Sequence, residues 1–230
     1  MDTGIKIIVY SLDINGYDEI INPLMYDKNV RYILFSDDKT KTSKFWEVIY
    51  IDNIEELDYR KLARYYKVNS HLVLPEHEIS IYVDSSFTFN VLNISLIFEE
   101  NDFSNCELMC YKHFMRNCTY EESGAVIDLK TESEEVVSEQ MSMYENEGFP
   151  KEFGLFETGL MIRRNNVKVN QFNSVWWEQI KNFSGRDQLS QVYSSWKSGV
   201  NICSFKKGDD IYSNSYLTKF RPHKKKWLVN

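Results

Sequence analysis

The sequence lacks most of the features that mark membrane, zinc-binding and nucleic-acid-binding proteins. No apolar run approaches the roughly 20 residues that cross a bilayer as a helix, and no signal peptide is visible at the N-terminus. The four cysteines form no C-x-x-C pair and the four histidines form no H-x-x-x-H pair, so a zinc or redox motif has little support. The net charge of -7 argues against a nucleic-acid binder, which needs a basic surface. We therefore expect a cytoplasmic protein with reduced, mostly buried thiols.

What the chain does contain is enough apolar material for one large folded domain. Of its 230 residues, 43% are hydrophobic and 15% are aromatic, which suffices for a sizeable core and argues against disorder. Apolar β-branched runs alternate with stretches of helical spacing, the order typical of an α/β fold with a mostly parallel central sheet and covering helices. Strands are expected at residues 5–10, 32–35, 46–51, 79–83, 107–111, 160–162 and 201–205, and helices at 57–72, 91–100, 132–144, 175–181 and 184–196.

Polar side chains lie at the ends of several of these elements. In a doubly wound sheet the carboxyl ends of the strands meet at one edge, so such side chains can converge from distant parts of the chain. The candidates are Asp37, Asp38, Asp84, His113, Glu157, Asp187 and Gln188. Each one also has a purely structural explanation: Asp37 closes a turn, His113 is a hydrogen-bonded surface residue, and Asp187 is a first-turn helix charge. Their joint pattern is harder to explain in this way.

The most informative position is Asp84, which ends the buried strand in the stretch Ile79–Ser86. Taken alone, this stretch favours a helix N-cap, because Asp and Ser are good capping residues. At the carboxyl end of a core strand, however, an Asp can also hold a divalent cation that binds a diphosphate. The stretch by itself leaves both explanations open.

Two groups of basic residues could supply positive charge. Arg60, Arg64 and Lys67 recur at i, i+4 and i+7, so they share one face of the helix expected at 57–72. Such a face is usually only exposed to solvent, but it could also aim cations at a phosphate. Near the C-terminus, Lys224–Lys226 follow Arg221, and this cluster is either a solvated tail or part of a site.

Five blocks of the sequence, covering much of the chain, resemble a known family. They are KLARYYKVN (61–69), IYVDSSF (81–87), YKHFMRNCTYEE (111–122), GLFETGLMIRRNN (154–166) and WWEQIKNFSGRDQLS (176–190). Together they resemble the glycosyltransferase-like family best known from plant TOD-type and mucilage-related members. The resemblance implies a GT-A fold, an α/β sandwich with a Rossmann-like donor half. We therefore expect one domain over 1–230, with a nucleotide-sugar-binding half at 1–100 and an acceptor half with a basic tail at 101–230.

Carried over position by position, the resemblance implies a metal-assisted donor site. Asp84 and Ser86 take the places of the DxD motif that binds Mn2+ or Mg2+ through hard oxygen ligands. Because Ser86 stands where the second Asp is expected, metal affinity should be weak. The ending at 223–227 loosely resembles that of glycogenin-like transferases, which implies that His223 completes the metal site and that Lys226 neutralises the departing diphosphate.

The same resemblance implies roles for the remaining candidates. Asp37 and Asp38 would contact the nucleobase or ribose, and Asp187 would be the catalytic-side carboxylate, with Glu157 as its competitor. The other residues expected to bind the donor are Arg64, Lys67, Ser86, His113 and Gln188.

These expectations define a glycosyltransferase that moves a sugar from a nucleoside diphosphate sugar to a hydroxyl of a glycan or lipid-linked acceptor, in surface polysaccharide synthesis. An inverting enzyme would use Asp187 or Glu157 as a base, whereas a retaining enzyme would use the carboxylate to stabilise positive charge on the sugar. The alternative is a non-catalytic sugar-nucleotide or glycan binding module. A hydrolase is less favoured, because a zinc amidase needs a His/Asp ligand set. No nucleic acid is expected as a partner, and contact with the inner face of a membrane would be peripheral at most.

Overall fold

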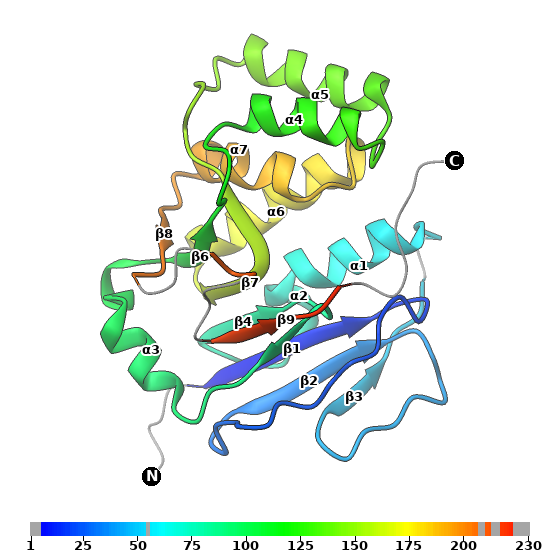
Figure 1. The fold of residues 1–230 in the computed structure, drawn as a ribbon, viewed down its shortest axis with the longest axis vertical. Coiled ribbons are helices and arrows are strands. Elements are labelled where there is room, and N and C mark those ends of the chain that lie inside the picture. Colours follow the sequence, from blue (N-terminus) through cyan, green and yellow to red (C-terminus); the bar gives the residue numbers. More distant parts are fainter. Residues whose placement is uncertain (1–5, 54–55, 207–209, 213–216, 223–230) are drawn as a thin grey trace.

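The computed structural model describes residues 6–53, 56–206, 210–212 and 217–222, and Figure 1 shows their arrangement. Its elements, in chain order, are β1 (Ile7–Asp13), β2 (Arg31–Ser36), β3 (Glu47–Tyr50), α1 (Tyr59–Val68), α2 (Ser70–Val73), β4 (Ile79–Val83), β5 (Phe87–Phe89), α3 (Ile94–Glu100), η1 (Phe103–Asn105), β6 (Leu108–Lys112), α4 (Thr119–Asp128), α5 (Glu134–Asn146), β7 (Phe156–Arg164), α6 (Val167–Asn182), α7 (Gln188–Ser198), β8 (Ile202–Ser204) and β9 (Thr218–Phe220).

Seven strands form the central sheet, in the order β3-β2-β1-β4-β7-β6-β8. Neighbouring strands are parallel except at β7, which runs antiparallel to both β4 and β6. In β1, Ile8 and Tyr10 pack on one face and Val9 on the other, and burial on both faces is what a strand inside a parallel sheet requires. The expected α/β fold with a mostly parallel sheet and covering helices is confirmed.

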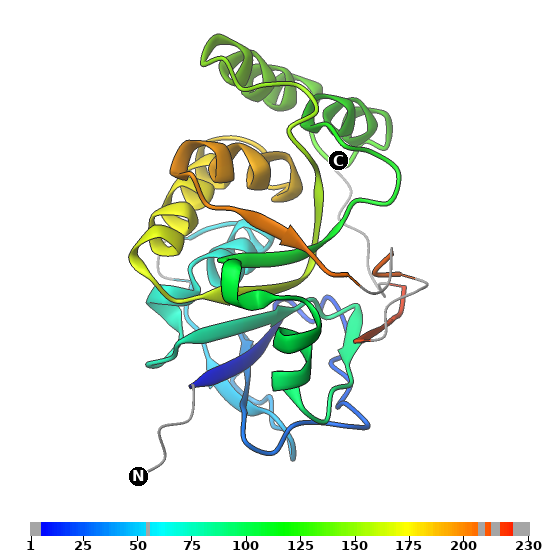
Figure 2. The same cartoon turned by 90° about the vertical axis from the view of Figure 1, so that its left-hand side faces the viewer.

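Each face of the sheet has its own cover (Figures 1 and 2). Helices α1, α2 and α6 pack on the face that carries Ile8 and Tyr10. Helix α3 and the separate β5–β9 pair pack on the opposite face, with Val9. Helices α4, α5 and α7 share a third apolar cluster, at the top of Figure 1. No helix among the described residues combines the length and the apolar character needed to span a bilayer.

Strands occur in all seven expected places, whereas the helices differ more. The helix expected at 57–72 is interrupted at Asn69, whose side chain donates to the Tyr65 carbonyl at 3.2 Å and ends α1. Helix α6 begins earlier than expected, because Asn166 caps it and accepts from the Val169 N–H at 2.9 Å. Ser184 does not cap α7, since its hydroxyl accepts from Arg186 and the helix starts after Asp187. Helix α4 and strands β5 and β9 were not expected.

The cysteines differ from the expectation of reduced thiols. Cys106 and Cys203 form a disulfide, with their Cα atoms 6.0 Å apart. The pairing is possible because β8 lies beside β6, an arrangement that the spacing of cysteines along the chain does not reveal. Cys110 and Cys118 are free and buried, as expected, and burial raises the pKa of Cys110 to about 12.

Candidate active site at the carboxyl edge of the sheet

The carboxyl ends of β1, β2, β4 and β6 meet at one edge of the sheet, because these strands run in the same direction. Asp84 directly follows β4, and His113 directly follows β6. Strand β7 runs the opposite way, so Glu157 and Thr158, near its start, also lie at this edge. The structure therefore brings together polar residues that were selected from separate parts of the sequence.

Asp84 begins a tight turn between two strands. The Phe87 N–H donates to the Asp84 carbonyl at 2.8 Å, and β5 follows immediately, so the N-cap explanation of Asp84 is wrong. The Asp84 N–H donates to the Gly159 carbonyl on β7 at 2.8 Å. The Ser85 hydroxyl lies 2.8 Å from Asp18 Oδ2 and 3.3 Å from Asp84 Oδ1. Two carboxylates thus flank one hydroxyl at this corner.

A cation at this corner would have hard oxygen ligands of the kind that Mg2+ and Mn2+ prefer. The motif at 84–86 has a single carboxylate, because Ser86 stands at its last position. Asp18, from the loop after β1, brings a second carboxylate to this corner. Ser86 itself is buried, and its carbonyl accepts from the Arg221 N–H at 2.7 Å. The described residues contain no group of three or more His, Cys, Asp and Glu arranged to hold a metal, so a ligand's own oxygens would have to complete the coordination. The other two candidates, His223 and Lys226, lie outside the described residues.

Asp187 is buried between two cations at the start of α7. Arg64 Nε lies 3.1 Å from Asp187 Oδ1, and Lys67 Nζ lies 2.5 Å from Oδ2. Lys67 is only 1% exposed, and its Nζ also donates to Thr158 Oγ1 at 3.0 Å. Burial alone would raise the pKa of Asp187, but Arg64 and Lys67 hold it well below its usual range. Asp187 is therefore a permanent anion that fixes two cations, and a poor proton acceptor at neutral pH.

The basic face expected on α1 exists, but it has two different partners. Arg60 pairs with Glu132 at 3.2 Å, away from the strand ends, whereas Arg64 and Lys67 pair with Asp187. Burial would lower the pKa of Arg64, but the negative charges of Asp187 and Asp84 outweigh it and raise that pKa. Arg64 therefore contacts Asp187 and is also within reach of the charge of Asp84.

Glu157 is buried like Asp187, but the donors that bind it are uncharged. Its Oε2 accepts from Gln188 Nε2 at 3.3 Å and from the Tyr212 hydroxyl at 3.2 Å, while its Oε1 is buried with no hydrogen-bond partner in the described part of the chain. Burial, with a smaller contribution from Glu122, raises the pKa of Glu157 to about 7, although the bonds from Tyr212 and Gln188 oppose this. Glu157 therefore gains and loses a proton near neutral pH, as a general base must.

His113 lies between two carboxyl groups. Its Nδ1 accepts from the backbone N–H groups of Met115 at 3.2 Å and Arg116 at 3.0 Å, so the proton of the neutral ring is assigned to Nε2. Nε2 is 3.7 Å from Glu122 Oε2 and 3.8 Å from Glu157 Oε1. Burial lowers the pKa of His113, although Glu122 opposes this. Arg116 Nε lies 2.5 Å from Glu122 Oε2 on the other side of that carboxyl group.

The acidic residues after β2 bind nearby loops. The Asp37 carboxylate accepts from the Asn15 N–H at 2.9 and 3.1 Å, which ties the loop after β1 to the end of β2. Asp38 accepts from the N–H and hydroxyl of Thr40 at 2.8 and 2.7 Å. Both lie at the carboxyl edge, and their contact with a nucleobase or ribose stays a prediction.

Several residues of this region were not selected from the sequence, namely Asp18, Glu122, Arg163 and Tyr212. Arg163 is fully buried and donates to the carbonyls of Lys67 at 2.7 Å and Val68 at 2.8 Å, at the end of α1, and to the Tyr10 hydroxyl. A charged residue inside an apolar strand must find such partners, so Arg163 could have been selected from the sequence. The other three lie in loops or on a helix of weak apolar pattern, and only the fold brings them close.

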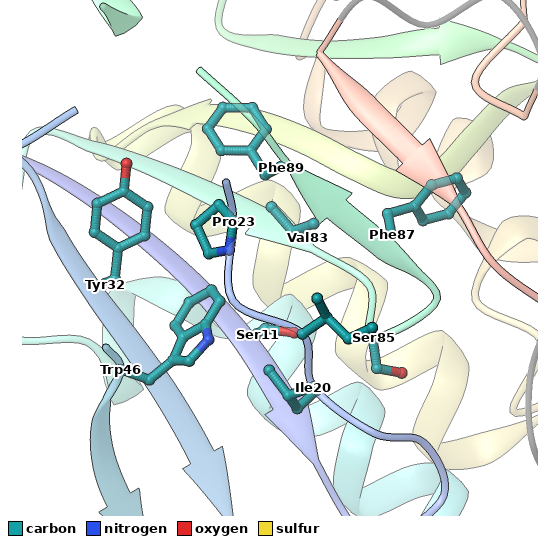
Figure 3. A pocket seen from close by; sticks show the side chains of 10 residues that line it. Ser11, Ile20, Pro23, Tyr32, Trp46, Val83, Ser85, Phe87 and Phe89 are labelled. Atoms are coloured by element: carbon teal, nitrogen blue, oxygen red, sulfur yellow. The ribbon is translucent and has the colours of Figure 1, made fainter. Parts of the chain in front are cut away.

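Figure 3 shows a small pocket beside this corner, on the sheet face opposite α1. Ser11, Val83, Ser85 and Trp46 are among the side chains that line it. Its volume of about 10 Å³ accommodates about one water molecule, so it is too small for a nucleotide. The Trp46 indole N–H is buried with no partner in the described residues, and a water here would satisfy it.

Comparison with known proteins confirms the family resemblance. Residues 2–211 match the family described as TOD1/MUCI70, glycosyltransferase-like domain. One relative is the alkaline ceramidase TOD1 of Arabidopsis thaliana, 23% identical over 220 residues that cover 81% of this chain and 47% of that protein, so the chain spans about half the length of this relative. The apo structure of the WbbM bifunctional glycosyltransferase is similar with a TM-score of 0.49 and 10% identity, over 84% of this chain and 38% of that one. Because the family match covers most of the sequence, the chain belongs to the TOD1/MUCI70 glycosyltransferase-like family.

Proposed function

We propose that this protein is a GT-A-type glycosyltransferase that moves a sugar from a nucleoside diphosphate sugar to a hydroxyl of a glycan or lipid-linked acceptor, in surface polysaccharide synthesis. The observation that carries the proposal is a pair of buried carboxyl groups in opposite environments. Asp187 is held ionised by Arg64 and Lys67, whereas Glu157 has a pKa of about 7. Enzymes separate the roles of two carboxyl groups in this way, and membership of a glycosyltransferase-like family supports transfer chemistry.

The donor diphosphate would bind at the corner formed by Asp84, Ser85 and Asp18. Mn2+ or Mg2+, held there by Asp84 and Asp18 and, as the resemblance implies, by Ser86 and His223, would screen the charge of the departing diphosphate. Arg64 lies close enough to Asp84 to feel its charge and adds positive potential that needs no metal. Weak metal dependence is therefore expected.

Transfer requires three changes at the sugar. The acceptor oxygen bonds to the anomeric carbon, the bond from that carbon to the diphosphate breaks, and the acceptor proton goes to a base. Glu157 suits the base role better than Asp187, because it is close to half ionised at neutral pH. The Tyr212 hydroxyl already donates to Glu157 Oε2 at 3.2 Å, so in an inverting reaction the acceptor hydroxyl would donate to Oε1, which has no hydrogen-bond partner among the described residues. In a retaining reaction, a carboxylate would instead stabilise positive charge on the sugar.

Two other functions make different predictions. A non-catalytic binding module would bind the donor without turnover under any divalent metal, and the single Asp of the motif at 84–86 favours it. The relative named as an alkaline ceramidase raises amide hydrolysis as a further possibility. A zinc amidase holds its metal with three protein ligands, and the described residues contain no such group of His, Cys, Asp and Glu.

The decisive experiment is a thermal-shift panel of nucleoside diphosphate sugars, with and without Mn2+, because a ligand that binds the folded state raises Tm. Turnover of the donor that binds is then compared among the wild type, Asp84→Ala and Glu157→Gln. Glu47→Gln serves as the control, since among the described residues Glu47 forms an exposed pair with Arg31 alone. Loss of turnover in both site variants supports the proposal, and full turnover in both contradicts it. Release of fatty acid from ceramide by the wild type would favour the hydrolase.

A further inference from the structure

Two large apolar side chains stand exposed beside the candidate active site. Phe114 is 56% exposed and Met115 is 67% exposed, and both lie in the loop that follows β6 and His113. Exposed apolar groups that lie together commonly mark a binding surface.

Phe114 packs against His113 and Tyr212, the two side chains that also approach Glu157. Its ring stacks on the His113 imidazole, with centroids 5.3 Å apart and planes at 18°. It also meets the Tyr212 ring edge-to-face at 5.9 Å and 71°. His113 Nε2 lies 3.8 Å from Glu157 Oε1, and the Tyr212 hydroxyl lies 3.2 Å from Glu157 Oε2. The exposed ring is therefore separated from the Glu157 carboxyl group by a single layer of side chains.

We propose that the exposed ring of Phe114, with Met115 beside it, is the platform on which a sugar ring of the acceptor stacks, next to Glu157. This inference rests on the proposed function and specifies its acceptor. The electron-rich face of an aromatic ring attracts the weakly positive C–H groups on one face of a pyranose. A sugar stacked there is one layer of side chains away from Glu157, so it would anchor the acceptor, and a neighbouring sugar of the same acceptor would present the reacting hydroxyl.

The chemistry around the platform favours a sugar over a hydrocarbon chain. Arg116 follows two residues after Phe114, and its side chain is 24% exposed beside Glu122, so its guanidinium would lose hydration without gaining a partner under an acyl chain. Glu157 Oε1 has no hydrogen-bond partner among the described residues, which a hydroxyl can remedy and a methylene cannot. The acceptor that fits is therefore a glycan, or the sugar end of a lipid-linked one.

The test is saturation-transfer NMR on the whole chain, with trisaccharides of glucose, xylose, galactose and N-acetylglucosamine as probes and dihexanoylphosphatidylcholine below its micelle concentration as the lipid probe. We expect at least one trisaccharide to give a saturation-transfer signal. That signal should fall several-fold in Phe114→Ala and change little in Phe114→Tyr. Leu129→Ala is the matched control, because Leu129 is 68% exposed at the far end of α4 and should leave the signal intact.

Each outcome decides one point. Any of three results overturns the platform: no trisaccharide gives a saturation-transfer signal, the signal survives Phe114→Ala, or the lipid probe alone gives a signal. The donor-induced Tm shift is measured in the same samples. If no sugar nucleotide shifts the Tm of the wild type, the proposed function fails instead. If Phe114→Ala loses the donor shift as well as the trisaccharide signal, Phe114 supports the whole site and the acceptor platform is overturned.

Discussion

Lys67 Nζ and Asp187 Oδ2 lie 2.5 Å apart in the interior of the protein, so helices α1 and α7 are joined by a buried ion pair. Asp187→Asn should cost about 3–5 kcal/mol of unfolding free energy, because it leaves the Lys67 and Arg64 cations buried without their anion. Asp187 makes no side-chain capping bond to α7, so the loss reports the ion pairs rather than a cap. Urea denaturation at neutral pH measures it.

The matched control for that measurement is Glu47→Gln. The Arg31–Glu47 pair is also short, at 2.8 Å, but both side chains are about half exposed. Removing it should cost less than about 1 kcal/mol. Equal losses in the two variants would mean that burial of the Asp187 pair contributes nothing.

Glu157 is expected to make the protein less stable as pH rises. Its pKa is 4.5 in the unfolded chain and about 7 in the folded protein, so both states are protonated below the first value and both are ionised above the second. Between them the folded state binds more protons, and stability falls by up to about 3 kcal/mol as pH increases. Glu157→Gln removes this effect. Its Tm relative to the wild type should therefore be higher at pH 8 than at pH 5, and a constant difference would contradict the raised pKa.

The same group should set the pH dependence of sugar transfer. If Glu157 is the base, kcat/KM rises with pH through about 7 as Glu157 loses its proton. Tyr212→Phe removes a hydrogen bond that lowers the pKa of Glu157, so this rise should move to higher pH. A pH profile that does not move in Tyr212→Phe would show that the Tyr212–Glu157 bond is absent in the working enzyme.

The tautomer of His113 can be observed directly. Because Nδ1 accepts two backbone N–H groups, we expect the neutral ring at pH 8 to carry its proton on Nε2, seen in long-range ¹H–¹⁵N spectra. His71 provides an internal comparison in the same spectrum. Burial also lowers its pKa, and its Nδ1 lies 3.2 Å from the Asn173 amide nitrogen instead of two backbone N–H groups. An Nδ1-protonated ring at position 113 would rule out the arrangement between Glu122 and Glu157.

The Cys106–Cys203 disulfide should contribute measurably to stability. It joins residues 97 apart in sequence, and constraining an unfolded loop of that length stabilises a protein by about 2–5 kcal/mol. Dithiothreitol should therefore lower the Tm of the wild type and leave that of Cys203→Ser unchanged. Equal Tm values for the wild type with and without reductant would show that the bond does not form.

Much of the fold could be predicted because the strands carry their own signal. A run such as Ile79–Val83 is buried on both sides, and its β-branched composition alone identifies it. The direction of β7 could not be predicted, because the pattern of a doubly buried strand is the same in either direction. Helix α4 was missed because Gly124 and its polar neighbours give it a weak apolar periodicity.

The site was predictable where a residue follows a strand, and not where a loop folds back onto it. Asp84 and His113 could be chosen by position, since they end core strands. Asp18 and Tyr212 contribute through contacts with Ser85 and Glu157, and such contacts depend on the tertiary fold alone. The proposed roles of Asp187 and Glu157 could be distinguished only by their surroundings, which are two cations at Asp187 and, at Glu157, uncharged donors with one buried oxygen left without a partner among the described residues.

Two residues of strand β7 hold Lys67, one at its backbone and one at its ammonium group. Arg163 binds the Lys67 carbonyl at 2.7 Å, and Thr158 binds its ammonium at 3.0 Å. A surface lysine gives up as much as about 2 kcal/mol of rotamer entropy when a ligand immobilises it, and Lys67 has already given this up on folding. The proposed diphosphate would therefore meet a Lys67 side chain that is already ordered, and its binding would cost no rotamer entropy at this residue.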